Sequence, residues 1–111
     1  MLTSPQPSAP LLVLIGELDD YDTMARTLAA RSGCAVLMPD YRLAPEHPFP
    51  AGLEDVEDTI RWASTQTTRW STAPAPIIVG GDSAGGNLTA VAVQALAGHV
   101  HIAGQILIYP V

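Results

Sequence analysis

A serine flanked by glycines is the part of this sequence best suited to covalent chemistry. Residues 81–85 read Gly-Asp-Ser-Ala-Gly, after the apolar run 77–79 and before an apolar run with helical spacing over 88–96. A Gly-x-Ser-x-Gly pentapeptide between a strand and a helix is typical of a nucleophile elbow, in which a tight turn exposes the serine hydroxyl. We therefore predict a strained backbone at Ser83, with its hydroxyl at a helix N-terminus that stabilises developing negative charge.

The neighbours of the serine have separate expected roles. Glycine gives backbone freedom and clearance at such a turn, so Gly81, Gly85 and Gly86 are expected where side chains do not fit. The backbone N–H of Ala84 is the expected oxyanion donor, and Asp82 is expected to have a structural role. The alternative is that the serine merely caps a helix in a glycine-rich turn and does no chemistry.

Composition and charge limit the classes of protein to consider. The 111-residue chain is 48% hydrophobic, has five arginines and no lysine, and carries a formal net charge of −6. This length fits one domain, and the negative charge disfavours binding to nucleic acids. No run reaches the roughly 18 apolar residues of a membrane span, and no positive charge precedes the first apolar run as in a secretory signal. Together with a single cysteine, Cys34, these features favour a cytoplasmic protein.

The elements that must position the serine follow from the spacing of apolar residues. Residues 1–10 are expected to be a disordered or lead-in segment, and 39–50 a proline-rich loop. In the first helix, Met24 and Leu28, with Ala25 beside them, are expected to face inward. The third helix carries almost no charge, so we expect other elements to cover it. The predicted strands are 11–15, 34–38, 77–79 and 104–109, and the predicted helices are 21–31, 52–67 and 88–97. This alternation predicts a parallel sheet with right-handed crossovers.

Three separated blocks resemble the hormone-sensitive-lipase-like family of α/β-hydrolase esterases. They are residues 40–55, beginning Asp-Tyr-Arg-Leu-Ala-Pro-Glu-His-Pro, residues 81–88, Gly-Asp-Ser-Ala-Gly-Gly-Asn-Leu, and residues 107–110, Leu-Ile-Tyr-Pro. The resemblance implies a partial α/β-hydrolase fold, with four mostly parallel strands alternating with three helices. It also implies hydrolysis of small carboxylic esters through an acyl-enzyme on the serine. In the first block, Arg42 and Glu46 are expected to pair and to have a structural role.

Two parts of the family's machinery have no counterpart here. The resemblance implies a His-Gly-Gly-Gly stretch after the first strand, whose N–H groups form much of the oxyanion hole, whereas residues 11–17 read Leu-Leu-Val-Leu-Ile-Gly-Glu. It also implies an acid and a histidine far downstream of the serine. His99 and His101 follow a helix about 22 Å long that leads away from Ser83, and His47 lies in the proline-rich loop. A serine without a base is a poor nucleophile, so residues 11–111 are expected to be an incomplete domain, inactive alone.

Two further interpretations stay open. In one, the chain is half of a split enzyme, and another polypeptide supplies the acid and the histidine. The apolar last strand, ending at 109–111, would offer its unpaired edge to that polypeptide or to a second copy. In the other, the glycines at 80–81 and 85–86 hold an anion at a helix N-terminus in a non-catalytic module, although the chain lacks the lysine of a P-loop. No cofactor or metal is expected, because His99 and His101 have no third ligand at suitable spacing.

Overall fold

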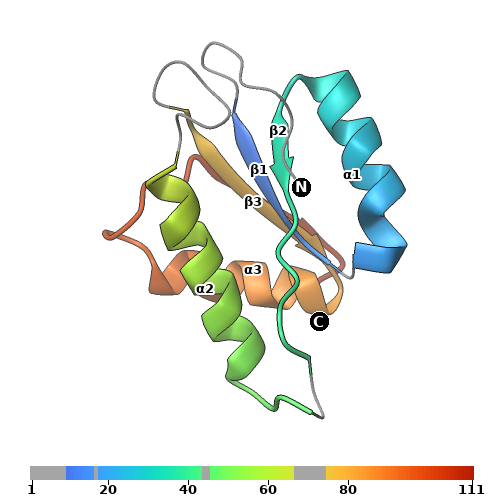
Figure 1. Ribbon diagram of the computed structural model, residues 1–111. Helices are drawn as coiled ribbons and strands as arrows, with labels where there is room; N and C mark the ends of the chain where they lie inside the picture. Colours follow the sequence, from blue (N-terminus) through green and yellow to red (C-terminus); the bar gives the residue numbers. More distant parts are fainter. Residues whose placement is uncertain (1–9, 17, 44–45, 67–74) are drawn as a thin grey trace.

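Strands and helices alternate along the chain and form one parallel sheet (Figure 1). The computed structural model describes residues 10–16, 18–43, 46–66 and 75–111. Within them the strands are β1 (Leu11–Ile15), β2 (Ala35–Leu37), β3 (Ile77–Asp82) and β4 (Gly104–Ile108), and the helices are α1 (Leu18–Ser32), α2 (Ala51–Ser64) and α3 (Ala84–Ala95). The strand order is β2-β1-β3-β4, with every pairing parallel. The predicted partial α/β fold is confirmed, while the predicted lead-in segment falls on residues 1–9, outside the described part.

Helices cover both faces of the sheet, and β1 shows how the faces are divided. Every residue of β1 is buried, as expected for a central strand of a parallel sheet. Leu11, Val13 and Ile15 join the core beneath α2 and α3. Leu12 and Leu14 point the other way and join the core beneath α1. The continuous apolar run of this strand therefore belongs to two separate cores.

The buried face of α2 is the one that its sequence predicts. Leu53, Val56, Ile60 and Ala63 recur at spacings of three and four and are all buried. Burial of each larger side chain contributes about 1.5–3 kcal/mol, so this face holds the helix against β1 and β3. The helix begins at Ala51, directly after the proline-rich loop. Its first turn is thereby fixed close to the start of α3, where the serine lies.

The inward face of α1 differs in part from the prediction. Ala25 is fully buried against the sheet and Leu28 is half-buried, as expected. Met24 is 37% exposed, so the prediction that it faces inward is wrong. The small side chain of Ala25 occupies the line of closest approach to the sheet. Met24, one position earlier, is thereby left at the rim beside the ends of β1 and β3.

Helix α3 packs on the sheet through small residues. Gly85, Gly86, Thr89 and Ala92 are buried, and the Thr89 hydroxyl donates to the Gly85 carbonyl at 2.8 Å. Val91, on another side, is 39% exposed. The expectation that other elements cover α3 is therefore wrong for this side of the helix in the described part of the chain. Because the fully buried residues of α3 are small, the helix lies close to β3, while Leu88 and Val93 pack against the core only in part.

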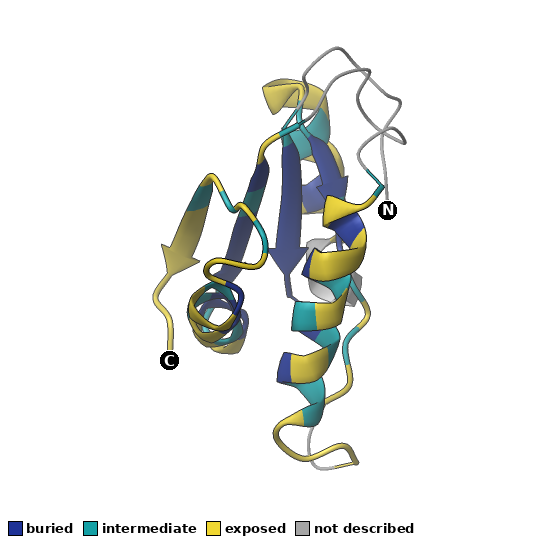
Figure 2. Ribbon diagram, turned by 90° about the vertical axis from the view of Figure 1, so that its left-hand side faces the viewer, coloured by how far each residue is buried: buried dark blue, intermediate teal, exposed yellow. Residues whose placement is uncertain are grey.

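Strand β4 forms one edge of the sheet and is the most exposed strand (Figure 2). It pairs with β3 on one side. Ile106, Leu107 and Ile108 are 50%, 39% and 44% exposed. Three successive apolar residues, pointing to alternate faces, are thus all accessible, because α3 covers only part of one face and no described element lies beyond the edge.

No described helix has the length and apolarity to cross a bilayer.

Candidate active site

Ser83 lies at the junction between β3 and α3, with a strained backbone. β3 ends at Asp82, α3 begins at Ala84, and Ser83 between them has φ 50° and ψ −119°. A non-glycine residue held in this region costs about 1–3 kcal/mol and persists only where its surroundings fix it. The predicted strain at the serine is confirmed. Both flanking elements extend closer to the serine than the apolar runs indicate, because β3 continues through Gly80 and Gly81 and the first turn of α3 contains Gly85 and Gly86.

The glycines on either side of the serine lie where side chains do not fit. A Cβ on Gly81 would lie 2.6 Å from the Gly85 carbonyl oxygen and 2.8 Å from that of Ile15. A Cβ on Gly85 would overlap the Ile15 carbonyl oxygen. A Cβ on Gly86 would lie 3.1 Å from the Cα of Pro110. The end of β1 and the residues after β4 thus close on the turn from two sides.

Backbone hydrogen bonds hold both the N–H and the carbonyl of the serine. Its N–H donates to the Ile108 carbonyl at 2.9 Å. Its carbonyl accepts from the N–H groups of Asn87 at 3.1 Å and Val111 at 3.2 Å. The side chain of Ser83 makes no capping hydrogen bond to α3. The interpretation of Ser83 as a mere helix cap is therefore not supported by the structure.

The N–H of Ala84 is an available donor next to the serine hydroxyl. Ala84 is the first residue of α3 and is exposed. Its N–H has no intrahelical acceptor, as at any helix start, and none among the residues that the structure describes. The positive end of the helix dipole lies here and favours negative charge. The local chemistry therefore suits an oxygen that gains charge close to the Ser83 side chain.

None of the three histidines is joined to the serine by a hydrogen bond in the described structure. His99 and His101 are exposed and follow the far end of α3, a helix of 12 residues that is about 18 Å long. His47 is exposed in the loop before α2. The described residues also contain no cluster of three or more His, Cys, Asp or Glu side chains suited to a metal ion.

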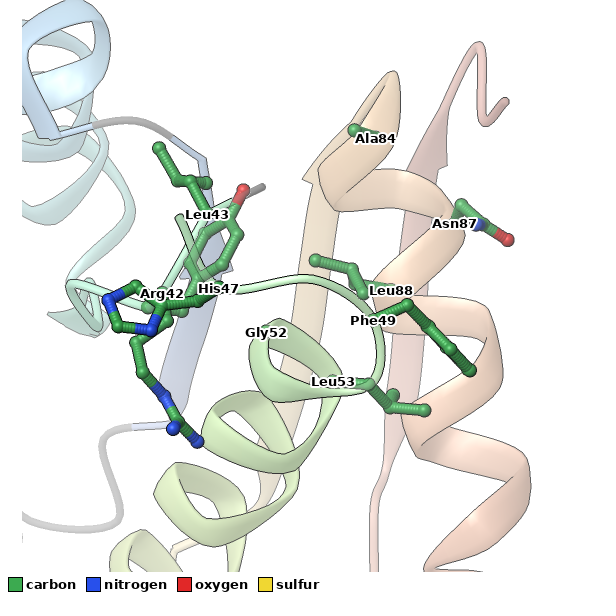
Figure 3. A pocket seen from close by; sticks show the side chains of 10 residues that line it. Arg42, Leu43, His47, Phe49, Gly52, Leu53, Ala84, Asn87 and Leu88 are labelled. Carbon is green, nitrogen blue, oxygen red and sulfur yellow. The ribbon is translucent and has the colours of Figure 1, made fainter. Parts of the chain in front are cut away.

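A pocket of about 250 Å³ opens beside the start of α3 (Figure 3). The loop after β2 forms one wall, and the first turns of α2 and α3 form the other. Ala84, next to the serine, lies at its edge, and apolar side chains predominate. The lining residues are Tyr41, Arg42, Leu43, His47, Phe49, Gly52, Leu53, Ala84, Asn87 and Leu88. The pocket therefore gives an apolar surface in reach of the serine turn.

An ion pair between Arg42 and Asp55 fixes the pocket wall to α2. The Arg42 guanidinium donates from Nε to Oδ2 and from Nη2 to Oδ1, both at 2.9 Å, and the Arg42 N–H donates to Oδ2 at 2.8 Å. This bidentate arrangement is among the stronger kinds of hydrogen bond. The predicted pairing of Arg42 with Glu46 is wrong. The two-pronged guanidinium meets a carboxylate that α2 holds in place, whereas Glu46 is exposed in the loop.

Asp55 is the site residue that sequence reasoning missed. It is one of four acidic residues at positions 54–58, near the start of α2, where negative charge suits the helix dipole. Its partner lies 13 residues away, so only the fold brings the pair together. The only signal was its position within the first family-like block. The hydrogen bonds from Arg42 hold the pKa of the Asp55 carboxyl below its ordinary value of 3.8.

The pKa shift of Asp55 predicts a pH-dependent contribution to stability. A carboxylate with a lowered folded-state pKa stabilises the fold at pH values above its unfolded pKa, and this contribution is lost as pH falls through the folded-state pKa. Asp55→Asn should therefore lower the free energy of unfolding near neutral pH and have no effect in strong acid. The decrease should be well below the roughly 2–5 kcal/mol of a core truncation. Urea unfolding at both pH values, with Asp58→Asn as the control, measures it. Equal stability of Asp55→Asn and the parent at neutral pH would rule the contribution out.

Comparisons with known proteins agree with this geometry. Residues 13–111 match a family described as "alpha/beta hydrolase fold". Carboxylesterase NlhH of Mycobacterium tuberculosis is 42% identical over 98 residues, which cover 86% of this chain and 31% of that protein. Among solved structures, bacterial heroin esterase superposes with a TM-score of 0.87 at 32% identity, covering 95% of this chain and 36% of the other.

A thermophilic relative gives the same result. The hyperthermophilic esterase of the archaeon Pyrobaculum calidifontis superposes with a TM-score of 0.83 at 37% identity, covering 95% of this chain and 37% of the other. The chain spans about a third of the length of these relatives. Agreement in sequence and in structure over nearly all of the chain establishes the family. The chain belongs to the α/β hydrolase fold family, among the hormone-sensitive-lipase-like carboxylesterases.

Proposed function

We propose that this chain is the nucleophile-bearing part of a serine carboxylesterase. The observation that carries the proposal is the backbone of Ser83, which has a positive φ between β3 and α3 and a hydroxyl that does not cap the helix. Such a turn holds a hydroxyl at the carboxyl end of a parallel sheet, where a substrate can reach it. The names of the relatives, carboxylesterase and esterase, point to small carboxylic esters as the substrate class.

The proposed reaction is acyl transfer through the serine. The Oγ of Ser83 attacks the ester carbonyl carbon, its proton passes to a base, and the carbonyl oxygen becomes an oxyanion. The N–H of Ala84 donates to that oxyanion. When the carbonyl re-forms, the alcohol leaves with a proton, and water then hydrolyses the acyl-enzyme. Gly81, Gly85 and Gly86 give the turn the clearance it needs, and Asp82 ends the strand that carries it.

The chain alone is proposed to be inactive. The base must take the serine proton through a hydrogen bond, and no described histidine makes one with Ser83. The family resemblance also implies oxyanion donors from a glycine-rich stretch. This stretch has no counterpart at residues 14–17, which read Leu-Ile-Gly-Glu. Loss of one such donor typically lowers the rate by about 10²–10³. Residues 11–111 are thus proposed to be an incomplete catalytic domain.

A hydrolysis assay tests this proposal directly. The purified chain is expected to hydrolyse p-nitrophenyl butyrate no faster than Ser83→Ala, and both should match the protein-free background. Ser64→Ala, which removes an exposed hydroxyl at the end of α2, is the matched control. Turnover that exceeds the background and disappears in Ser83→Ala but not in Ser64→Ala would overturn the proposed inactivity.

A second candidate is half of a split esterase, and the exposed edge of β4 favours it. Among the described residues, no strand pairs with the outer edge of β4, beside Ile106, Leu107 and Ile108, which are all partly exposed. A strand from another polypeptide, or from a second copy, would pair there and cover these side chains. Native mass spectrometry of the chain purified from its own cells distinguishes the candidates. A stable complex with a second polypeptide supports the split enzyme, and a monodisperse monomer argues against it.

A further inference from the structure

The three residues that follow β4 fold back over the serine turn. Tyr109 has a positive φ of 31°, which turns the chain from the end of β4 toward the start of α3. Pro110 then packs so closely on Gly86 that a Cβ there would lie 3.1 Å from both its Cα and its Cβ. Val111 follows, with its N–H donating to the carbonyl of Ser83 at 3.2 Å. This contact is separate from the β3–β4 ladder and from α3.

The hydrogen bond from Val111 acts on the same peptide unit that carries the available donor. The carbonyl of Ser83 and the N–H of Ala84 belong to one peptide bond, which is planar and trans, so the two groups point in opposite directions. Whatever fixes the direction of the carbonyl therefore fixes the direction of the N–H. The carbonyl accepts one bond from Asn87, within α3, and one from Val111, outside the helix.

A carbonyl oxygen that accepts two hydrogen bonds also makes the N–H of the same peptide unit a stronger donor. Hydrogen bonds that share a polarisable group strengthen one another, so an amide whose oxygen accepts two bonds has a more polar N–H. The Ala84 N–H has no acceptor in the described part of the structure. The direction and the polarity of the Ala84 N–H are therefore both set by the hydrogen bonds to the Ser83 carbonyl. That carbonyl points away from the position where a substrate oxygen would lie.

We propose that Val111 is a positioning residue for oxyanion stabilisation, and that its backbone N–H orients and polarises the Ala84 N–H through the carbonyl of Ser83. The inference rests on the proposed function, because it assigns the Ala84 N–H to the oxyanion. It assigns no chemistry to the Val111 side chain. Tyr109 and Pro110 deliver the N–H to its acceptor, through the positive φ of the first and the packing of the second on Gly86.

A cysteine in place of the serine reports on this donor without needing a catalytic base. In the double variant Cys34→Ala, Ser83→Cys, the remaining thiolate is a negative charge beside the Ala84 N–H. A thiol at a helix N-terminus has a pKa below the roughly 8.5 of free cysteine, and the pH dependence of iodoacetamide alkylation measures it. Adding Val111→Pro removes the N–H, because proline has none. Adding Val111→Ala keeps the N–H and serves as the matched control.

We expect Val111→Pro to raise the thiol pKa and to slow alkylation near neutral pH by about three- to tenfold, as for a shift of up to one pKa unit. Val111→Ala should leave both unchanged. If the thiol pKa is low in the double variant and Val111→Pro does not change it, the positioning role of Val111 is wrong. The assignment of the Ala84 N–H as a donor is then retained. If the thiol has an ordinary pKa in the double variant itself, the donor assigned in the proposed function fails.

A second measurement separates this effect from general loss of structure. In the otherwise unchanged chain, the amide proton resonance of Ala84 should shift in Val111→Pro and stay in place in Val111→Ala, with the amide resonances of β1 retained in both. An unmoved Ala84 resonance in a folded Val111→Pro protein would contradict the proposal. Loss of the β1 resonances in Val111→Pro alone would contradict it too, since the N–H would then support the whole fold.

Discussion

Gly85→Ala is expected to lower the free energy of unfolding by at least about 3 kcal/mol, a large fraction of the total stability of a domain of this size. The added Cβ would overlap the Ile15 carbonyl oxygen, which belongs to the central strand. Overpacking against side chains typically costs about 1–3 kcal/mol because they can move. A backbone carbonyl in a parallel ladder has less freedom to move, and domains of this size have only about 5–15 kcal/mol of total stability.

Gly104→Ala is the matched control for this substitution. Gly104 begins β4, and a Cβ there would meet nothing within 4 Å. A glycine-to-alanine change at a compatible position is neutral or stabilises by about 0.4–1 kcal/mol. Urea unfolding followed by far-ultraviolet circular dichroism measures both variants. Similar midpoints for Gly85→Ala and Gly104→Ala would show that the turn is not packed as closely as described.

The second large effect concerns the oxyanion donors that we propose this chain lacks. In a chimera, the matching part of this chain replaces the aligned segment of carboxylesterase NlhH, so that the relative supplies the residues before and after it. Insertion of His-Gly-Gly-Gly after Ile15 is expected to raise kcat for p-nitrophenyl butyrate by about 10²–10³, the typical value of one good donor or more. The insertion would place further N–H groups beside the start of α3, close to the N–H of Ala84.

The same chimera gives the control for the serine. Ser83→Ala should lower kcat by about 10⁴ or more, as for removal of a nucleophile that acts as a unit with its base. Ser64→Ala should leave kcat unchanged, since that hydroxyl bonds the Arg61 carbonyl at the end of α2. An insertion that leaves kcat unchanged, in a chimera whose activity depends on Ser83, would contradict the proposal that this chain needs further N–H donors to stabilise the oxyanion.

The fold could be predicted from the sequence because its apolar runs are short and regular. The run at β1 and the three-and-four spacing in α2 each indicate one element and one buried face. Element ends were less certain wherever glycine occurs. β3 continues through Gly80 and Gly81, and α3 begins three residues after Gly81, although glycine favours neither strand nor helix. Pairing with β1 extends β3 through these two glycines, and the tight turn at Ser83 sets the residue at which α3 begins.

The site was predictable at the serine and less so around it. The pentapeptide indicates a strained turn on its own, and φ at Ser83 confirms it. The bonds that hold the turn and the pocket wall join residues distant in sequence: Arg42 with Asp55, and Ser83 with Val111. Charge pattern favoured a local partner for Arg42 because a sequence shows proximity along the chain only. Backbone hydrogen bonds such as that of Val111 leave no trace in residue types.

Fluorophosphonate labelling, read by mass spectrometry of the peptide that contains Ser83, tests most directly whether this serine is placed for acyl transfer and lacks its own base. A fluorophosphonate reacts with a serine only when a base activates the hydroxyl. The chain alone is expected to remain unlabelled, and the chimera, which has the relative's remaining residues, is expected to carry one label, on Ser83. Labelling of Ser83 in the chain alone, or labelling of the active chimera at another residue, would contradict this assignment.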